Sequence, residues 1–211
     1  MSEQTLVATS VVVGYLIGSI PFGVIAARLG GLGDIRKIGS GNIGATNVLR
    51  SGRKDLALIT LIGDGGKGAL AVLVGWLLAR GAGDADLFMA CAGGAAFLGH
   101  LFSVWLRFKG GKGVATFLGV MFAAVWPAGL LCALTWLIMA YLFRTSSLAA
   151  LTAAALAPLF VFVTKNLIVY EPYRLMLMAL VMSILIFIKH HENIRRLLKG
   201  EEPKIGAGKT A

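Results

Sequence analysis

Glycine-rich polar stretches recur in this hydrophobic chain, and the longest of them carries groups that suit a phosphate. Residues 39–50 read GSGNIGATNVLR and offer hydroxyl and amide groups from Ser40, Asn42, Thr46 and Asn47. Arg50, the last residue of the stretch, has the fork geometry for a bidentate pair with a phosphate. Glycine lets backbone N–H groups approach an oxyanion closely because no Cβ intervenes. We interpret this stretch as a phosphate-binding loop.

Related chemistry occurs in three other polar stretches, which are GDGGKG at 63–68, RFKGGKG at 107–113 and KHHEN at 189–193. Lys67-Gly68 and Lys112-Gly113 each precede an apolar run, so we expect each pair to begin a helix whose N-terminus favours an anion. Asp64 lies at the edge of an apolar run, where an acid is costly unless it is paired or functional. Lys67 is its expected partner.

Each of these stretches also has a simpler explanation. Residues 63–68 could form a turn between two half-helices, since glycine often interrupts helices. Lys109 and Lys112 could contact only lipid headgroups. His190 and Asn193 are three residues apart and would share a helix face, which can arise by chance. The observation that favours a common site is that all four stretches fall on one side of the membrane in the topology derived below.

Several sharper motifs are missing from the sequence. A P-loop needs Ser or Thr after its Gly-Lys pair, but Lys67 and Lys112 are each followed by glycine. The sequence has no G-x-S-x-G nucleophile elbow. None of the three histidines begins the H-x-x-x-x-D pattern of many glycerolipid acyltransferases, and no Ser-His-Asp or Cys-His set is evident.

Membrane helices are the elements that must position these residues. Of the 211 residues, 57% are hydrophobic and 14% are charged, and the mean hydropathy is +0.82, so the composition predicts an integral membrane protein. The net charge of +10 is then better explained as a membrane-orientation signal than as nucleic-acid binding. Cys91 and Cys132 lie in apolar runs, and we interpret both as core residues without a disulfide.

Seven apolar runs follow one another, namely Leu6–Leu29, Leu56–Ala79, Leu87–Leu106, Val114–Trp126, Pro127–Phe143, Leu148–Val163 and Leu175–Ile188. The first has no basic residue before it, so we expect a retained span rather than a cleaved signal peptide. Residues 114–143 could form one long helix, but we favour two, broken at Pro127. With seven spans and the N-terminus outside, all Lys and Arg residues lie on one side except Arg80, Lys165 and Arg174. The positive-inside rule makes that side cytoplasmic.

The sequence therefore predicts an all-α integral membrane protein, a compact bundle of about seven transmembrane helices with the N-terminus outside and the C-terminus cytoplasmic. Some of the helices should be short, because several runs fall near or below the roughly 20 residues that a straight span needs. We expect a single domain over residues 1–211, with flexible tails at 1–5 and 203–211.

Four motifs together resemble a known family, the bacterial membrane acyl-phosphate:glycerol-3-phosphate acyltransferases. They are GSGNIGATNVLR at 39–50, GDGGKG at 63–68, GHLFSVWLRFKGGKGVAT at 99–116 and HHENIRRLLKGEE at 190–202. The motifs occur in the expected order, and the flanking spans extend the resemblance over essentially the whole chain. The first and third motifs are long and specific.

The resemblance implies a reaction in which an acyl phosphate gives its long acyl chain to the 1-hydroxyl of glycerol 3-phosphate. The products would be lysophosphatidic acid and phosphate, in the first acylation of phospholipid synthesis. An acyl phosphate is already activated, so the chemistry needs no covalent enzyme intermediate, cofactor or metal, and a donor phosphate oxygen could take the proton. The implied setting is a monomer in the bacterial inner membrane, with its site at the cytoplasmic face, surrounded by lipid and linked functionally to an acyl-phosphate-forming enzyme.

The resemblance also implies roles for particular residues. The catalytic candidates are Ser40, Arg50, Lys112 and His190. The substrate-binding candidates are Gly39, Gly41, Asn42, Gly44, Thr46, Asn47, Asp64, Lys67, Gly68, Lys109, Gly110, Gly111, Gly113, Thr116 and Asn193. Ser40, Arg50 and Lys112 would hold glycerol 3-phosphate or the transferring phosphate, whereas Lys67 and the backbone of 110–113 would hold the acyl phosphate.

Two other classes of protein compete with an acyltransferase. An anion or organophosphate transporter would also place broken helices around an anion, but transporters usually bind near the bilayer midplane. Here the polar motifs gather at one face. A structural membrane protein could use its glycines for helix packing, which leaves the clustering of Asp64, Lys67, Lys112 and Arg50 unexplained.

Overall fold

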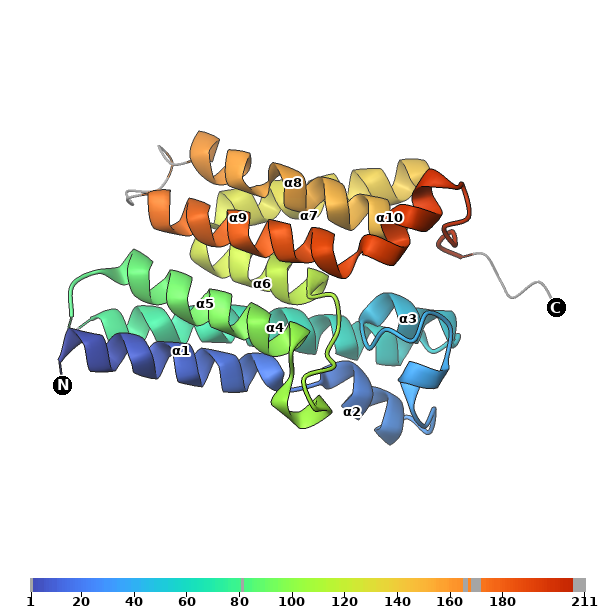
Figure 1. The fold of residues 1–211 in the computed structure, drawn as a ribbon, viewed down its shortest axis with the longest axis horizontal. Coiled ribbons are helices and arrows are strands. Elements are labelled where there is room, and N and C mark those ends of the chain that lie inside the picture. Colours follow the sequence, from blue (N-terminus) through green and yellow to red (C-terminus); the bar gives the residue numbers. More distant parts are fainter. Residues whose placement is uncertain (1, 81, 165–166, 168–171, 207–211) are drawn as a thin grey trace.

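The computed structural model describes residues 2–80, 82–164, 167 and 172–206, and it contains helices and no strands within that part of the chain. The α-helices are α1 (Glu3–Ser19), α2 (Phe22–Leu29), α3 (Ala45–Arg50), α4 (Lys54–Ala79), α5 (Ala85–Leu101), α6 (Val114–Ala124), α7 (Trp126–Phe143), α8 (Ser146–Thr164), α9 (Pro172–Lys189) and α10 (His191–Leu198) (Figure 1). Two short 3-10 turns are η1 (Ile35–Lys37) and η2 (Val104–Leu106).

Five helical segments among the described residues are long and apolar enough to cross a membrane, namely Glu3–Leu29, Lys54–Ala79, Ala85–Leu106, Trp126–Phe143 and Ser146–Thr164. The pair α9 and α10, bent by 63°, adds a sixth only where both helices are counted as one span. Helix α6 has only 11 residues, about 16 Å at 1.5 Å per residue, and is therefore about half the thickness of a hydrocarbon core. The all-helical fold with some short helices is confirmed, and the orientation of the bundle stays a prediction.

The predicted division of residues 114–143 into two helices is confirmed. Helix α6 ends at Ala124 and α7 begins at Trp126, while Val125 between them has non-helical dihedral angles of φ −144° and ψ 77°. Pro127 lies in the first turn of α7, where a missing N–H group breaks no helical hydrogen bond. The break therefore precedes the proline by two residues.

The alternative explanation of 63–68 as a turn is wrong, and so is the expected helix start at Lys67-Gly68, because these residues lie in the middle of the continuous helix α4. Lys67 and Gly68 therefore do not begin a helix. Gly68 is needed for close packing, since a Cβ there would lie 2.5 Å from the carbonyl oxygen of Thr116 on α6. A Cβ at Gly119 of α6 would collide with the backbone of Gly65. Small residues at such crossings let two membrane helices approach closely.

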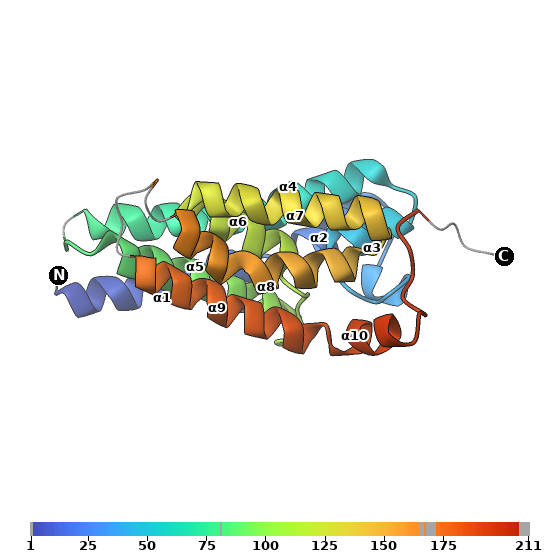
Figure 2. The ribbon, with the colours of Figure 1, turned by 90° about the horizontal axis from the view of Figure 1, so that it is seen from above.

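The short helix α6 lies at the centre of the bundle, between α4 and α5 on one side and α7 and α9 on the other (Figure 1). Phe117, Val120 and Met121 of α6 are fully buried and pack into the main hydrophobic cluster. In both views α2, α3 and α10 lie at the same end of the bundle (Figures 1 and 2). This arrangement brings the N-terminus of α6 and the predicted polar loops together at that end.

The ends of the chain are partly ordered against the bundle. Helix α1 begins at Glu3, inside the first expected tail, with Ser2 as its N-cap. The backbone N–H of Ile205, inside the second expected tail, donates to the carbonyl of Arg144 at 2.6 Å. Met1, Lys165 and residues 207–211 lie outside the described part of the chain. The flexibility expected of the remaining tail residues stays a prediction.

Candidate active site

A cavity of about 520 Å³ lies at the end of the bundle that carries the polar loops. One part of its wall is polar and is formed by Ser40, Asn42, Thr46, Arg50, Lys112, Ser146, Ser147, His190, Asn193 and Glu202. Another part is apolar and is formed by Leu58 and Leu61 of α4, Leu118 of α6, and Ala133, Trp136 and Leu137 of α7. The cavity can therefore hold an amphiphile with an anionic head.

The loop over residues 39–50 is organised by the buried side chain of Asn47. Its Oδ1 accepts from the backbone N–H of Ser40 at 2.9 Å and from the Ser40 hydroxyl at 3.2 Å. Its Nδ2 donates to the carbonyls of Ile35 and Ile38 at 3.1 and 2.9 Å. Gly39 has φ +57° and packs directly on Asn47, so a side chain at this position would clash. Asn47 thus shapes the loop with all of its hydrogen-bonding groups occupied.

Two contacts fix this loop against the other walls of the cavity. The hydroxyls of Thr46 and Ser146 are 3.1 Å apart, which ties the loop to the first turn of α8. The Asn42 side chain lies beside Gly111, where a Cβ would be 3.3 Å from its Oδ1. The loop is therefore held between α8 and the segment that leads into α6.

The glycines before α6 are not arranged as expected for a backbone that holds the acyl phosphate. The N–H groups of Gly110 and Gly111 donate to the carbonyls of Leu101 and His100 at 3.2 and 3.1 Å, so these two amides are not free for an anion. Gly113 caps α6 with φ +82° and lines the cavity together with the first residues of the helix. The predicted helix start after Lys112-Gly113 is confirmed, and the N-terminus of α6 with Lys112 beside it is the part of this segment that could hold an anion.

A series of hydrogen bonds through Asn193 and Glu202 positions the Lys112 side chain. Its ammonium group donates to Oδ1 of Asn193, whose Nδ2 donates to Oε1 of Glu202 at 2.6 Å. Ser147 and Arg196 donate to the two oxygens of the same carboxylate at 2.7 and 2.8 Å. Burial and then the charge of Arg196 lower the pKa of Lys112 below its ordinary value.

Glu202 is a site residue that the sequence interpretation missed. Burial alone would raise the pKa of its carboxyl, but hydrogen bonds from Ser147, Asn193 and Arg196 outweigh burial and hold the pKa below its ordinary value. The carboxylate therefore stays ionised and fixes Asn193. The available signal was the pair of acids Glu201 and Glu202 in a tail rich in Lys and Arg, but the position of Glu202 depends on the tail folding back onto α8.

His190 is buried at the junction of α9 and α10. Its Nδ1 lies 2.8 Å from the carbonyl oxygen of Ile186, an arrangement that requires the proton on Nδ1 and leaves Nε2 as an acceptor. Burial lowers the pKa of His190 from 6.5 to about 4. The ring is therefore neutral at physiological pH and is a weak base.

A second buried polar group consists of Asp64, Lys67 and His100. Lys67 donates to the Asp64 carboxylate at 2.7 Å, as predicted. It also donates to the carbonyl of Ile20 at 2.7 Å, in the short connection between α1 and α2. Nδ1 of His100 lies 3.6 Å from Oδ1 of Asp64. Asp64 and His100 reach the cavity wall, whereas Lys67 does not. The Lys67 ammonium group already donates to Asp64 and Ile20 inside the protein, which argues against the expected role of Lys67 as an acyl-phosphate ligand.

The predicted site residues divide into two sets. Those that line the cavity are Ser40, Asn42, Gly44, Thr46, Asn47, Arg50, Asp64, Lys112, Gly113, His190 and Asn193. Those that do not are Gly39, Gly41, Lys67, Gly68, Lys109, Gly110, Gly111 and Thr116. Residues that line it without having been predicted include His100, Trp136, Ser146, Ser147 and Glu202. The described residues contain no cluster of three His, Cys, Asp or Glu side chains suited to a metal.

Comparison with known proteins identifies the family of this chain. The family model described as glycerol-3-phosphate acyltransferase matches residues 8–200. The chain belongs to the glycerol-3-phosphate acyltransferase family. A glycerol-3-phosphate acyltransferase of Caulobacter vibrioides is 64% identical, covering 96% of this chain and 89% of that protein. One of Rhodospirillum rubrum is 57% identical, covering 94% and 90%. The family predicted from the four motifs is confirmed.

Solved structures support the same assignment. The glycerol 3-phosphate form of PlsY (YgiH), an integral membrane glycerol 3-phosphate acyltransferase, aligns with a TM-score of 0.85 and 40% identity, covering 95% of this chain and 96% of that one. The lysophosphatidic acid form of the same protein aligns with a TM-score of 0.83, covering 95% of each chain. With its several apolar helices, this member of the family is a multi-pass membrane protein.

Proposed function

We propose that this enzyme transfers a long acyl chain from an acyl phosphate to the 1-hydroxyl of glycerol 3-phosphate, releasing lysophosphatidic acid and inorganic phosphate. The observation that carries the proposal is one cavity in which a cationic, hydrogen-bonding end continues into an apolar groove. The solved relatives, in a glycerol 3-phosphate form and a lysophosphatidic acid form, are consistent with this substrate and this product.

Two phosphate groups must be held at the polar end, one on each substrate. Arg50 and the Ser40 hydroxyl belong to the loop over residues 39–50, whereas Lys112 and the N-terminus of α6 belong to a separate segment of the cavity wall. We assign glycerol 3-phosphate to Arg50 and Ser40, and the donor phosphate to Lys112 and the α6 N-terminus. In a water-poor site such cations stabilise the negative charge that develops on the departing phosphate.

The acyl chain of the donor fits the apolar part of the cavity. Leu58, Leu61 and Leu137 are each about half exposed, so the groove between α4 and α7 opens toward the surrounding lipid. An apolar chain can enter from the bilayer, while the phosphate stays at the polar end. This arrangement would leave the acyl carbonyl near the boundary between the two parts, beside the hydroxyl to be acylated.

The proton acceptor is best assigned to the phosphate group of the acyl phosphate. The 1-hydroxyl oxygen attacks the acyl carbonyl carbon, the bond from that carbon to the phosphate oxygen breaks, and the leaving phosphate accepts the hydroxyl proton. His190 has a pKa of about 4 and is a weak base, so its Nε2 serves better as a hydrogen-bond acceptor that orients the substrate hydroxyl. Holding the two reactants together supplies the remaining acceleration, and no covalent enzyme intermediate is needed.

The setting of this reaction is also part of the proposal. We place the cavity at the cytoplasmic face of the bacterial inner membrane, because the basic loops surround it and the positive-inside rule assigns them there. The enzyme would work as a monomer, draw acyl phosphate from an acyl-phosphate-forming enzyme and pass its product into the membrane lipid.

The donor can be tested directly with purified protein and radiolabelled glycerol 3-phosphate. Palmitoyl phosphate, palmitoyl-CoA and palmitoyl carrier protein are supplied in parallel, and labelled lysophosphatidic acid is measured. We expect product from palmitoyl phosphate alone. Product from a thioester instead would overturn the donor assignment, and export of glycerol 3-phosphate from liposomes without acylation would favour the transporter alternative.

A further inference from the structure

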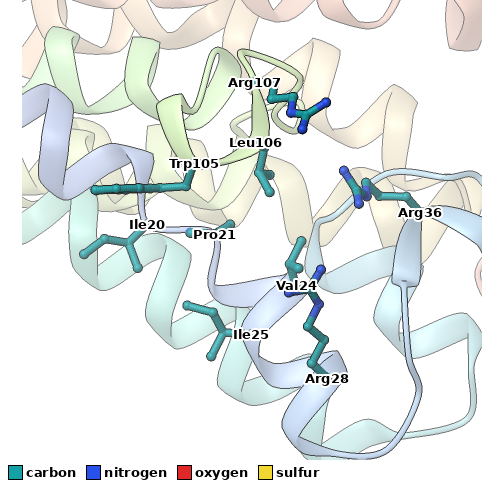
Figure 3. Close-up of a pocket in the computed structure, with 9 residues that line it drawn as sticks. All are labelled: Ile20, Pro21, Val24, Ile25, Arg28, Arg36, Trp105, Leu106 and Arg107. Atoms are coloured by element: carbon teal, nitrogen blue, oxygen red, sulfur yellow. The ribbon is translucent and has the colours of Figure 1, made fainter.

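A second hollow, of about 720 Å³, lies on the side of the bundle formed by α2, η1 and the turn after α5. Its wall consists of Ile20, Pro21, Val24, Ile25, Arg28, Arg36, Trp105, Leu106 and Arg107, and it shares none of them with the catalytic cavity (Figure 3). We call it the arginine groove. Its position at the ends of the spans Glu3–Leu29 and Ala85–Leu106 places it at the membrane–water boundary.

The charge of the arginine groove is strongly positive. Figure 3 shows the guanidinium groups of Arg28, Arg36 and Arg107 converging on one part of the hollow. Asp34 forms a bidentate ion pair with Arg36, at 2.9 and 2.8 Å, and offsets that one charge. The charge of Arg28 also acts on the Asp34 carboxylate, but neither Arg28 nor Arg107 forms an ion pair or a side-chain hydrogen bond with any described residue, so both guanidinium groups can still bind a ligand.

The turn that carries Arg107 is held firmly in place. Arg107 and Phe108 both have left-handed backbone conformations, at φ 52° and 62°, which non-glycine residues adopt only where the surrounding structure enforces them. The Ser103 hydroxyl donates to the carbonyl of Ser19 at 2.6 Å, and Tyr15 donates to that of Phe102 at 2.6 Å. These bonds fasten the turn to α1 and keep Arg107 opposite α2.

The remaining wall of the groove is apolar and open. Trp105 is 62% exposed and Ile25 is 41% exposed, although both belong to a groove with three arginines. An exposed tryptophan beside arginines is typical of the interface between lipid tails and headgroups. Inorganic phosphate would use the guanidinium groups but not the apolar wall, whereas a phospholipid would use both.

We propose that the arginine groove is a binding site for an anionic phospholipid, whose phosphate is held by Arg28 and Arg107 while one acyl chain lies along Ile20, Ile25 and Trp105. Guanidinium groups form bidentate, charge-assisted hydrogen bonds with phosphate oxygens. The buried contact from Lys67 to the carbonyl of Ile20 lies between this groove and Asp64 of the cavity wall. The groove is therefore a separate site, and the lipid in it is not the substrate.

The test compares lipid binding by two variants of the full chain that lose the same number of charges. Arg28→Gln with Arg107→Asn removes the two guanidinium groups that would bind the phosphate. Asparagine tolerates the left-handed conformation at position 107. The matched control is Arg195→Gln with Lys199→Gln, which removes two exposed cations, one on α10 and one at its C-cap. Native mass spectrometry of delipidated protein, titrated with phosphatidylglycerol or phosphatidylcholine, gives the affinity of the first bound lipid.

We expect the groove variant to bind phosphatidylglycerol about tenfold or more weakly than the wild type, since charge-assisted contacts to phosphate are lost. The control should bind it like the wild type, and phosphatidylcholine should bind all three proteins weakly. Equal loss in both variants would show only general charge attraction and would overturn the proposal. So would full displacement of the lipid by millimolar inorganic phosphate. The single variant Arg28→Gln, in an exposed helical position, tests the same point if the double variant does not fold.

Discussion

The catalytic cavity and the arginine groove are both basic, and both combine cations with apolar walls, but they are built differently. In the cavity, Lys112 is connected through Asn193 to Glu202, and the polar groups come from four separate segments joined by hydrogen bonds. In the groove, Arg28 and Arg107 are exposed and form no ion pair or side-chain hydrogen bond with the described residues. The difference teaches that reaction needs fixed groups, whereas recognition of a headgroup needs charge and an apolar surface.

The largest expected effect separates the cations of the cavity from other cations nearby. Arg50→Ala or Lys112→Ala should lower kcat/KM by about a hundredfold or more, because each removes a charge that stabilises phosphate in the transition state. Lys109→Ala is the matched control, since Lys109 belongs to the same stretch as Lys112 but is exposed and does not line the cavity. Acylation rates of folded, purified variants measure the difference, and near-normal rates for Arg50→Ala would refute its binding role.

Glu202 tests whether positioning within the cavity matters. Glu202→Ala should lower kcat by roughly tenfold to a hundredfold, because Asn193 and Lys112 lose their fixed position, and Glu202→Gln should recover part of the rate by keeping an acceptor for Ser147. In a Lys112→Ala background the same change should have little further effect, which a double-mutant cycle detects. Additive losses would show that Glu202 serves stability alone.

The apolar groove predicts a change in chain-length preference. Leu61→Trp or Leu137→Trp should narrow the space between α4 and α7, so activity with palmitoyl phosphate falls more than activity with shorter acyl phosphates, by about 0.8 kcal/mol for each CH₂ group that can no longer be buried. Leu134→Trp on α7 is the control, since Leu134 is similarly exposed but lies outside the cavity. An equal effect at all three positions would argue against this path for the chain.

The smallest effect concerns pH. His190 has a pKa of about 4 in the folded protein, below its ordinary 6.5, so the unfolded chain binds more protons between these values. Stability should therefore fall as the pH is lowered from 6.5 toward 4, and His190→Gln should reduce that fall. Thermal inactivation of both proteins across this range measures it. Identical pH profiles would show that His190 is not held neutral by burial.

The predictable part of the site was the part encoded by short polar stretches in an apolar chain. Arg50 and Lys112 stand out because polar groups near a bilayer are costly unless they have a function, whereas Asn193 became a candidate only through the family resemblance. The helical path of 63–68 was not predictable in the same way, since glycines that interrupt helices in water are tolerated in a membrane helix that must satisfy its own backbone. Glu202 was missed because its role exists only after the tail folds back onto α8.

We propose above all that an acyl phosphate lies with its head at Lys112 and the N-terminus of α6 and its chain along α4, α6 and α7. The most direct measurement uses a non-hydrolysable acyl phosphonate with a diazirine in mid-chain, photolysed on the purified enzyme and followed by peptide mass spectrometry. The account predicts labels at Leu58, Leu61, Leu118 or Leu137, which excess lysophosphatidic acid suppresses. Labels confined to α2 and the turn at Trp105, in the arginine groove, would contradict it.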